Sequence, residues 1–357
     1  MADKTGIEWT EATWNPLVGC SLKSPGCTNC YAMSMAARIQ RMTPGSHYVG
    51  TTQKSKAGPV WTGLVKLAPD HILTQPLRWS RPRKIFVNSM SDLFHESVPD
   101  EWIDRIFAIM ALAPQHTFQV LTKRSERMRE YMSAADTRFR VRTEYKALPA
   151  QGTALSRQLS HLPLWPLPNV WLGVSVEDQA RADERIPDLL ATPAAVRWIS
   201  AEPLLGELDL ESAWHGENAL DSECWGDCAW CKNGLPPLHN CQRGQGDWEK
   251  GRSGLDWVVA GGESGRKARP MHPDWARSIR DQCAAAGTPF LFKQWGEFHP
   301  ADQVKNAEQI AATGDIGRAL RDGHAHAFDD QWTWRIGKKR AGRLLDGIEH
   351  NGYPEAR

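Results

Sequence analysis

This chain of 357 residues has no excess of charge of either sign, no long apolar run and no apolar segment at its N-terminus. Its 43 Lys and Arg residues nearly balance its 42 Asp and Glu residues, so no global field attracts the protein to nucleic acid or to an anionic membrane. No stretch approaches the roughly 20 apolar residues that cross a bilayer. We therefore expect a soluble, cytoplasmic protein without a membrane partner, in which any contact with nucleic acid is local.

Cysteine is scarce for a disulfide scaffold, since only eight cysteines occur in the whole chain. Seven of them fall in two tight groups, which in a reducing compartment indicates metal binding. The eighth, Cys283, follows Trp275 and Ile279 at helical spacing. We expect that thiol to be packed in the core.

The first group is Cys20, Cys27 and Cys30, in a loop that also contains Gly19. Three thiolates with no nearby fourth ligand suit a metal centre that keeps one position open, such as an iron–sulfur cluster with one free iron. The alternatives are a zinc knuckle completed by a histidine such as His47, and three reduced thiols without a metal. Spacing alone leaves the three readings open.

Short β-rich runs recur along the chain and alternate with amphipathic segments. The runs are 84–89, 118–123, 170–175, 196–200, 257–262 and 289–293. Such near-continuous apolar runs are typical of strands covered on both faces, as in a parallel sheet. Helices are predicted between Pro99 and Pro114 and from Pro273 to a C-terminal cap at Gly287.

With one more strand before Cys20, these runs give about seven strand–helix units. The pattern predicts an α/β fold, either a partial or near-complete (β/α) barrel or an open doubly wound sheet. We expect residues 1–206 and 255–300 to form the barrel, 207–254 to be a cysteine-rich insertion, and 301–357 to be a C-terminal extension with a basic tail.

Polar residues follow the predicted strands at their C-terminal ends, where parallel sheets place their sites. A single Ser or Glu there is most often a helix cap, but six such ends in succession favour a shared polar cavity. The candidate residues at these ends are Asn88, Ser89, Ser175, Glu177, Glu202, Gly261, Gly262 and Glu263. Lys123, Arg124 and Lys293 are candidates to neutralise a carboxylate or phosphate, with a solvated surface position as the alternative.

The first cysteine group, with Tyr31 directly after Cys30, resembles the loop of the radical S-adenosylmethionine (radical SAM) superfamily. The usual loop there is Cys-x3-Cys-x2-Cys, whereas this chain has Cys-x6-Cys-x2-Cys. The stretch from Ile7 to Ala32 resembles more closely a phage-associated three-cysteine-motif family, a branch of that superfamily. The resemblance extends nearly end to end, through 88–95, 121–124, 173–177, 202–206, 261–265, 292–296 and 337–347.

This resemblance implies that Cys20, Cys27 and Cys30 bind a [4Fe-4S] cluster whose fourth iron binds S-adenosylmethionine. An electron donor such as flavodoxin or ferredoxin would reduce the cluster, and cleavage of the cofactor would yield a 5′-deoxyadenosyl radical. The resemblance further implies cofactor contacts by the aromatic Tyr31 and by the strand-end candidates above. Among these, Asn88 and Ser89 take the position of the SAM amino-group contact, and Ser175 and Glu177 face the ribose. Gly261, Gly262 and Glu263 match the superfamily's Gly-Gly-Glu motif but follow a later strand than it does there.

The second cysteine group is Cys224, Cys228, Cys231 and Cys241. Four thiolates close a tetrahedral zinc site, which can hold a small insertion folded without a core of its own. An auxiliary iron–sulfur cluster is the alternative, and the SAM-binding cluster itself is a third.

The sequence thus predicts a radical SAM enzyme acting on nucleic acid or a nucleotide. The alternative is a zinc-stabilised nucleic-acid-binding protein without redox chemistry. The substrate expectation rests on the phage association and on the basic tail, which contains Arg335, Lys338, Lys339, Arg340 and Arg343.

Overall fold

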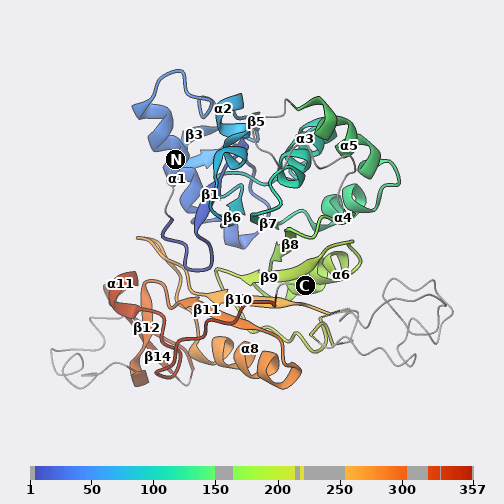
Figure 1. Ribbon diagram of the computed structural model, residues 1–357. Coiled ribbons are helices and arrows are strands. Elements are labelled where there is room, and N and C mark those ends of the chain that lie inside the picture. Colours follow the sequence, from blue (N-terminus) through green and yellow to red (C-terminus); the bar gives the residue numbers. More distant parts are fainter. Residues whose placement is uncertain are drawn as a thin grey trace. The chain divides into compact units, whose positions relative to one another are not determined.

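The structure is a computed structural model, and it describes residues 5–148, 164–213, 218–220, 254–303, 321–329 and 331–355. The chain divides into two compact units. Unit 1 contains Met1–Val174 and Asp188–Arg197, and unit 2 contains Ser175–Pro187 and Trp198–Ala356. Each unit combines parallel strands with helices, so the predicted α/β class is confirmed (Figure 1). The expected domain limits at residues 206 and 254 stay a prediction.

Unit 1 contains a parallel sheet of four strands in the order β1-β6-β7-β8. The strands are β1 (Ala12–Trp14), β6 (Lys84–Val87), β7 (Thr117–Thr122) and β8 (Val170–Ser175), whose last residue is already part of unit 2. The expected strand before Cys20 is therefore present as β1. Strand β6 ends two residues earlier than the apolar run predicts, because Asn88 adopts a φ of 62° and leaves the extended conformation.

The helices of unit 1 pack against this sheet and against one another. They are α1 (Tyr31–Met42), α2 (Asp70–Leu73), α3 (Asp100–Ala111), α4 (Ser125–Ser133) and α5 (Thr137–Ala147), with short 3-10 turns η1 (Pro25–Cys27) and η2 (Gln75–Arg78). Helix α3 confirms the predicted helix after the first long strand. It starts after Pro99, carries Asp100 and Glu101 in its first turn, and buries Ile103, Ile106, Phe107 and Met110.

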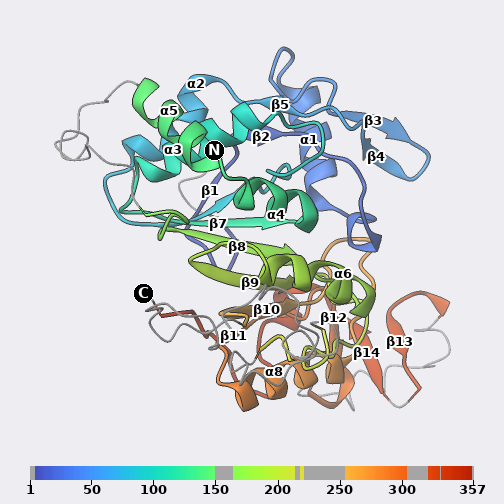
Figure 2. The same cartoon turned by 90° about the vertical axis from the view of Figure 1, so that its right-hand side faces the viewer.

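Two small antiparallel pairs complete unit 1. They are β2 (Leu17–Val18) with β5 (Lys66–Leu67), and β3 (Thr52–Ser55) with β4 (Gly58–Trp61). The β3–β4 hairpin packs against α1 and projects beyond it (Figure 2). Trp61 at the end of β4 is buried, so the hairpin contributes an aromatic ring to the apolar cluster on the inner face of α1.

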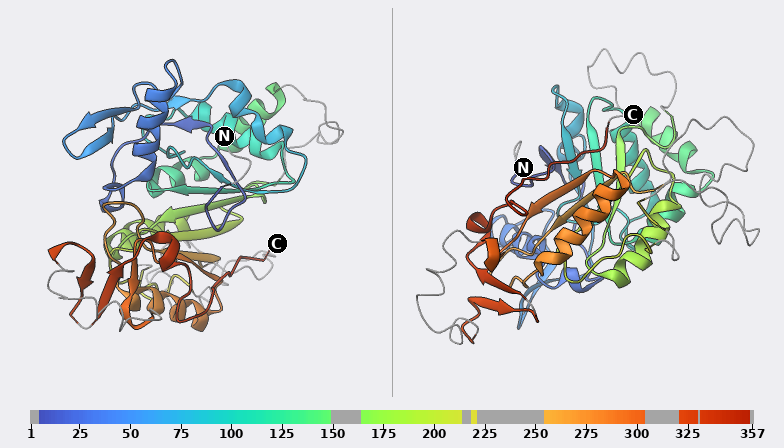
Figure 3. Two further views of the ribbon diagram at one scale, coloured as in Figure 1. Left: turned by 90° about the vertical axis from the view of Figure 1, so that its left-hand side faces the viewer. Right: turned by 90° about the horizontal axis from the view of Figure 1, so that it is seen from below.

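Unit 2 contains parallel strands in the order β9, β10 and β11. They are β9 (Val196–Ala201), which enters unit 2 at Trp198, β10 (Trp257–Gly261) and β11 (Phe290–Gln294). Helix α6 (Gln179–Leu190) precedes β9, and helix α8 (Pro273–Ala286) lies along β10 and β11 (Figure 3). Helix α8 begins and ends as predicted, with Pro273 in its first turn and Gly287 as a left-handed C-terminal cap. Cys283 is fully buried, as its spacing predicted.

The remaining elements of unit 2 follow β11. They are β12 (Phe298–Pro300), η4 (Ala301–Gln303), β13 (Ala325–Ala327), β14 (Trp332–Arg335) and α11 (Lys338–Ala341), with the three strands paired antiparallel in the order β12-β14-β13. No helix among the described ranges is long and apolar enough to cross a membrane.

Residues 342–353, here called the C-terminal strap, run antiparallel along the edge of β11. The Phe292 N–H donates to the His350 carbonyl at 3.1 Å, and the Gly352 N–H donates to the Phe290 carbonyl at 2.8 Å. At the far end of the strap, the Tyr353 ring stacks on Trp257 with 5.2 Å between ring centroids. The strap therefore covers backbone groups that an edge strand would otherwise expose.

Candidate functional site

The first cysteine group leaves strand β2 through Gly19, whose φ is +92°. A Cβ atom at this position would lie 2.0 Å from the Leu64 carbonyl oxygen, so only glycine fits. The Gly19 N–H donates to the Met90 carbonyl at 3.2 Å. This bond fixes the start of residues 19–31, here called the cysteine loop, against the loop that follows β6.

Within the cysteine loop, short backbone bonds determine the path between the sulfurs. The Cys27 N–H donates to the Ser24 carbonyl at 2.9 Å, and the Cys30 N–H donates to the Cys27 carbonyl at 3.3 Å. Cys30 is also the residue that precedes the first turn of α1. The Cys-x2-Cys pair is therefore one tight turn that leads directly into a helix.

Cys20 and Cys30 pack against the same apolar cluster. Its buried members are Val18, Ala32, Met33, Ala36, Tyr48, Trp61 and Met90. Burial raises the pKa of the Cys20 thiol to about 12, and Asp92 adds to this rise while Arg124 opposes it. Burial also raises the pKa of Cys30, against the opposing backbone N–H groups of Ala32 and Met33. Both groups are neutral thiols at pH 7 unless a metal displaces their protons.

Three cysteines in one loop are a donor set of the type that an iron–sulfur cluster takes. Across the described ranges, no three His, Cys, Asp or Glu side chains converge as they would around one metal ion. His47 forms no such group with the three cysteines there, and the zinc knuckle stays a prediction. In a four-iron cube each cysteine binds a different iron, so the three sulfurs need not meet at one point.

Asp92, in the loop after β6, ties this loop to the end of β7. Its buried carboxylate accepts hydrogen bonds from the Thr122 hydroxyl at 2.6 Å and from the backbone N–H groups of Phe94 and Lys123, each at 3.0 Å. A fourth donor is Arg124 Nη1, 3.2 Å from Oδ2. Four donors to one carboxylate make the two strand ends a single rigid platform.

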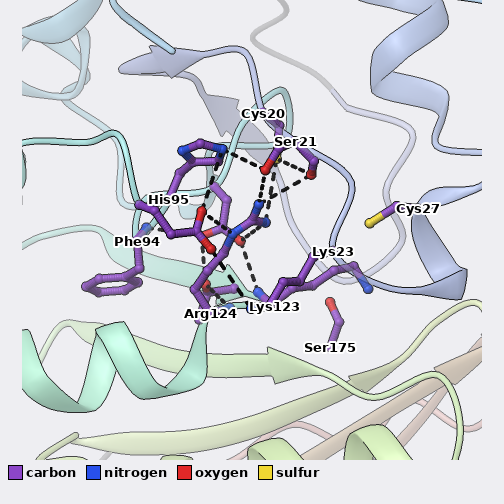
Figure 4. Close-up of polar contacts among 12 residues, drawn as sticks. Cys20, Ser21, Lys23, Cys27, Phe94, His95, Lys123, Arg124 and Ser175 are labelled. Carbon is purple, nitrogen blue, oxygen red and sulfur yellow. Dashed lines mark hydrogen bonds and ion pairs between the residues drawn. The ribbon is translucent and has the colours of Figure 1, made fainter. Parts of the chain in front are cut away.

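Arg124 reaches from that platform to the cysteine loop (Figure 4). Nη2 donates to the Ser21 hydroxyl at 2.8 Å, and Nη1 lies 3.7 Å from Cys20 Sγ. Although burial disfavours its charge, Asp92, Cys20 and Glu96 raise the pKa of Arg124 above its ordinary value. The surface position considered for Arg124 is wrong, because only 4% of the residue is exposed and its donors are already engaged.

His95 contacts the same Ser21 hydroxyl as Arg124 does. Its Nδ1 accepts the Ser97 N–H at 3.1 Å, so the ring proton lies on Nε2, which donates to the Ser21 hydroxyl at 2.9 Å. Burial and then Arg124 lower the pKa of His95, which keeps the ring neutral at pH 7. The nearby Glu96 carboxylate, 3.7 Å away, is therefore not an ion-pair partner of His95 at that pH.

Tyr31, Asn88 and Ser89 are brought together in unit 1. The Tyr31 hydroxyl donates to the Ser89 carbonyl at 3.0 Å, which joins the start of α1 to the end of β6. The Asn88 side-chain oxygen accepts the Leu17 N–H at 3.2 Å. Its buried Nδ2 group donates no hydrogen bond within the described part of the chain.

In unit 2, the candidate carboxylates already have protein partners. Glu177 is fully buried and accepts a hydrogen bond from Arg185 Nη1 at 3.1 Å, while the same nitrogen donates to the Ser175 carbonyl at 2.7 Å. Glu202 forms an ion pair with Lys293 at 2.9 Å and accepts a bond from the Ser200 hydroxyl. Contacts of these residues with a cofactor stay predictions.

The Gly-Gly-Glu motif has a clear packing role in unit 2. A Cβ atom at Gly261 would lie 2.8 Å from the Glu202 carboxylate, and one at Gly262 would lie 2.0 Å from the Trp295 carbonyl oxygen. Glu263 accepts two hydrogen bonds from the Arg269 guanidinium, at 2.7 and 2.9 Å. The motif therefore allows close strand packing and holds an ion pair between the buried Glu263 and the half-buried Arg269.

The second cysteine group, Cys224, Cys228, Cys231 and Cys241, lies outside the described residues.

The residues of the basic tail have different contacts. Arg335 donates to the backbone carbonyls of Gly265 and Arg266, and Arg343 donates to the strap residue Asn351. Lys338, Lys339 and Arg340 form one exposed turn, α11.

Sequence reasoning did not single out Asp92, His95 and Ser21. Their only signal was position, since Asp92 and His95 lie in a stretch that matched the family motifs and Ser21 follows the first cysteine. Arg124 was a candidate for a different reason, as a cation for an anionic ligand. In the structure, hydrogen bonds instead connect these four side chains, and Arg124 also donates to Cys20 Sγ.

Residues 4–354 match a sequence family described as a protein of unknown function, DUF5131. No curated protein and no solved structure matches the chain. Because the match covers nearly the whole sequence, including both units and the cysteine loop, the chain belongs to the DUF5131 family.

Proposed function

We propose that this protein is a radical SAM enzyme whose [4Fe-4S] cluster is held by Cys20, Cys27 and Cys30. The observation that carries the proposal is the position of the cysteine loop. Its first residue is bound to the loop after β6, at the C-terminal end of a parallel strand, which is where α/β folds place their sites. The apolar cluster beneath Cys20 and Cys30 supplies the dry surroundings that such a group needs.

A cluster held by three cysteines keeps one iron open, and when reduced it supplies the electron that cleaves S-adenosylmethionine to methionine and a 5′-deoxyadenosyl radical. The protein has to hold the cofactor beside it. The unpartnered Nδ2 of Asn88 is an amide donor, so it suits the methionyl carboxylate better than the amino group. Tyr31, bonded to Ser89, lies between the last cysteine and that strand end.

We propose that the parallel strands of the two units are parts of a partial (β/α) barrel of the radical SAM type, with flavodoxin or ferredoxin as electron donor in the cytoplasm. For the substrate we propose nucleic acid or a nucleotide. Its support is the exposed basic turn Lys338, Lys339 and Arg340, which can contact phosphates locally although the net charge is only +1.

The experiment is anaerobic purification followed by analysis of iron, acid-labile sulfide and zinc. The proposal expects iron and sulfide in equal amounts, a brown colour, and loss of both in Cys20→Ala and Cys30→Ala. Zinc without sulfide in the wild-type protein would favour the zinc-stabilised nucleic-acid-binding protein instead. The full chain is used, so a second cluster in the region 221–253 is recognised as iron that survives both substitutions.

A further inference from the structure

Arg124 is held in one orientation by two acidic residues and by the loop backbone. In addition to its bond to Asp92, Arg124 donates from Nε to Glu96 Oε2 at 3.3 Å and from Nη2 to the Ser21 carbonyl at 3.3 Å. Asp92 is itself fixed by three other donors, so the guanidinium cannot swing away without breaking the platform formed by β6 and β7. A planar cation held at both ends directs its remaining N–H in a fixed direction.

That remaining N–H is directed at a sulfur. Nη1 of Arg124 lies 3.7 Å from Cys20 Sγ, and a guanidinium has no acceptor, so the nitrogen is the donor and the sulfur the acceptor. Lys123, the neighbouring residue on the same platform, lies near enough to Cys30 to favour its thiolate. The end of β7 therefore presents positive charge to two of the three cysteines.

We propose that Arg124 is a positioning residue that fixes Cys20 as a ligand and raises the reduction potential of the cluster by hydrogen bonding to its sulfur. This inference rests on the proposed function. Hydrogen bonds to the ligand sulfurs are one of the factors that set cluster potentials, because they stabilise the more negative, reduced state. The Asp92 carboxylate balances the charge of Arg124, so the directed N–H bond has more effect than the net field.

The test is a redox titration of anaerobically purified, full-length protein followed by the absorbance and electron paramagnetic resonance of the cluster. The main variant is Arg124→Gln combined with Asp92→Asn, which removes both charges together and leaves no buried ion without a partner. Asn at position 92 keeps an acceptor for the Thr122 hydroxyl. The matched control is Arg127→Gln. Arg127 lies on α4 and donates to Asp100 and to the Val98 carbonyl.

At a fixed potential, the double variant is expected to show at least a tenfold lower ratio of reduced to oxidised cluster, which corresponds to about 59 mV for one electron. Arg124→Lys keeps the charge but lacks the two guanidinium nitrogens that donate to Asp92 and Ser21 together. Its reduction potential is therefore expected to shift in the same direction by a smaller amount. Arg127→Gln is expected to titrate as the wild-type protein. Iron content per chain is measured in every sample.

An unchanged potential in both Arg124 variants, with full iron content, would overturn this inference while leaving the proposed function intact. A wild-type protein without any iron–sulfur cluster would overturn both. If the double variant fails to fold, Arg124→Lys decides the question, because it retains the buried cation that Asp92 requires.

Discussion

The carboxylate of Asp92 lies 2.6 Å from the Thr122 hydroxyl, and this bond joins the loop after β6 to the last residue of β7. Both residues are buried, and the same carboxylate holds Arg124. Polar groups at the ends of two neighbouring strands therefore form a connected unit beneath the cysteine loop. The unit is a structural feature of the site before any ligand is considered.

Asp92→Ala is expected to lower the free energy of unfolding by about 3–5 kcal/mol, because it leaves the buried Arg124 cation without its main partner. Chemical denaturation measures this loss. The matched control is Asp70→Ala, whose carboxylate pairs with Arg105 but has a side chain 79% exposed. That pair should contribute no more than about 1 kcal/mol. Equal losses in the two variants would contradict the central role given to Asp92.

Gly19→Ala is expected to displace the cysteine loop, because the new Cβ would lie 2.0 Å from a backbone oxygen in a left-handed conformation. The control is Gly45→Ala, where φ is +86° but nothing lies within 4 Å. Gly45→Ala should cost only the backbone strain of about 1–2 kcal/mol and keep its bound iron. Gly19→Ala should lose iron in elemental analysis. Full iron content in Gly19→Ala would show that the loop does not need this path.

The C-terminal strap is expected to loosen in acid. Arg277, together with Arg280, holds the pKa of Asp346 below its ordinary value of about 3.9. This stabilisation is complete above pH 4 and is lost as the pH falls through the lowered pKa, when the folded carboxyl takes up its proton. Burial also lowers the pKa of His350, so its contribution is lost earlier, as the pH falls below about 6.5.

Hydrogen exchange of the Phe292 and Gly352 amides, which pair with the strap and β11, measures this loosening. Exchange is expected to accelerate in two steps, one below pH 6.5 and one below pH 4. Asp346→Asn should remove the lower step and raise exchange at neutral pH. Exchange that stays constant from pH 7 to pH 3, after correction for the intrinsic rate, would mean that the ion pairs do not hold the strap.

Glu263→Gln separates a packing role for the Gly-Gly-Glu motif from a role in cofactor binding. Its two bonds to Arg269 are charge-assisted, so the substitution is expected to lower the free energy of unfolding by about 1.5–3 kcal/mol. Glu211→Gln, at an exposed position, should change it by less than about 0.5 kcal/mol. Calorimetric titration with S-adenosylmethionine supplies the second measurement. Unchanged stability with weaker cofactor binding would assign Glu263 to the ligand instead.

The positions of the main strands along the chain and the ends of α3 and α8 could be predicted from the sequence because local signals determine them. Apolar runs specify buried strands, Pro99 and Pro273 begin helices, and Gly287 alone readily adopts the φ of 66° that ends α8. That the first cysteine group lies in a loop was predictable for the same reason, from Gly19 and the neighbouring loop residues. These features depend on neighbours a few residues apart.

The site network and the strap could not be predicted, because they depend on distant pairs. Arg124 is 104 residues from Cys20, and nothing in its own segment shows whether it faces solvent or the cysteine loop. The same holds for the strap, whose bonds to β11 join segments about 60 residues apart and follow no periodic pattern. Asp92 looked like an ordinary polar residue after a strand, although it accepts four hydrogen bonds.

The central claim is that Cys20, Cys27 and Cys30 hold a cluster that cleaves S-adenosylmethionine, and reductive formation of 5′-deoxyadenosine tests it most directly. Anaerobic full-length protein is assayed with dithionite beside Cys27→Ala and Cys283→Ala, where Cys283 is a buried thiol in α8. We predict 5′-deoxyadenosine from the wild-type protein and from Cys283→Ala, and none from Cys27→Ala. Equal product from Cys27→Ala, or no product from iron-loaded wild-type protein, would contradict the claim.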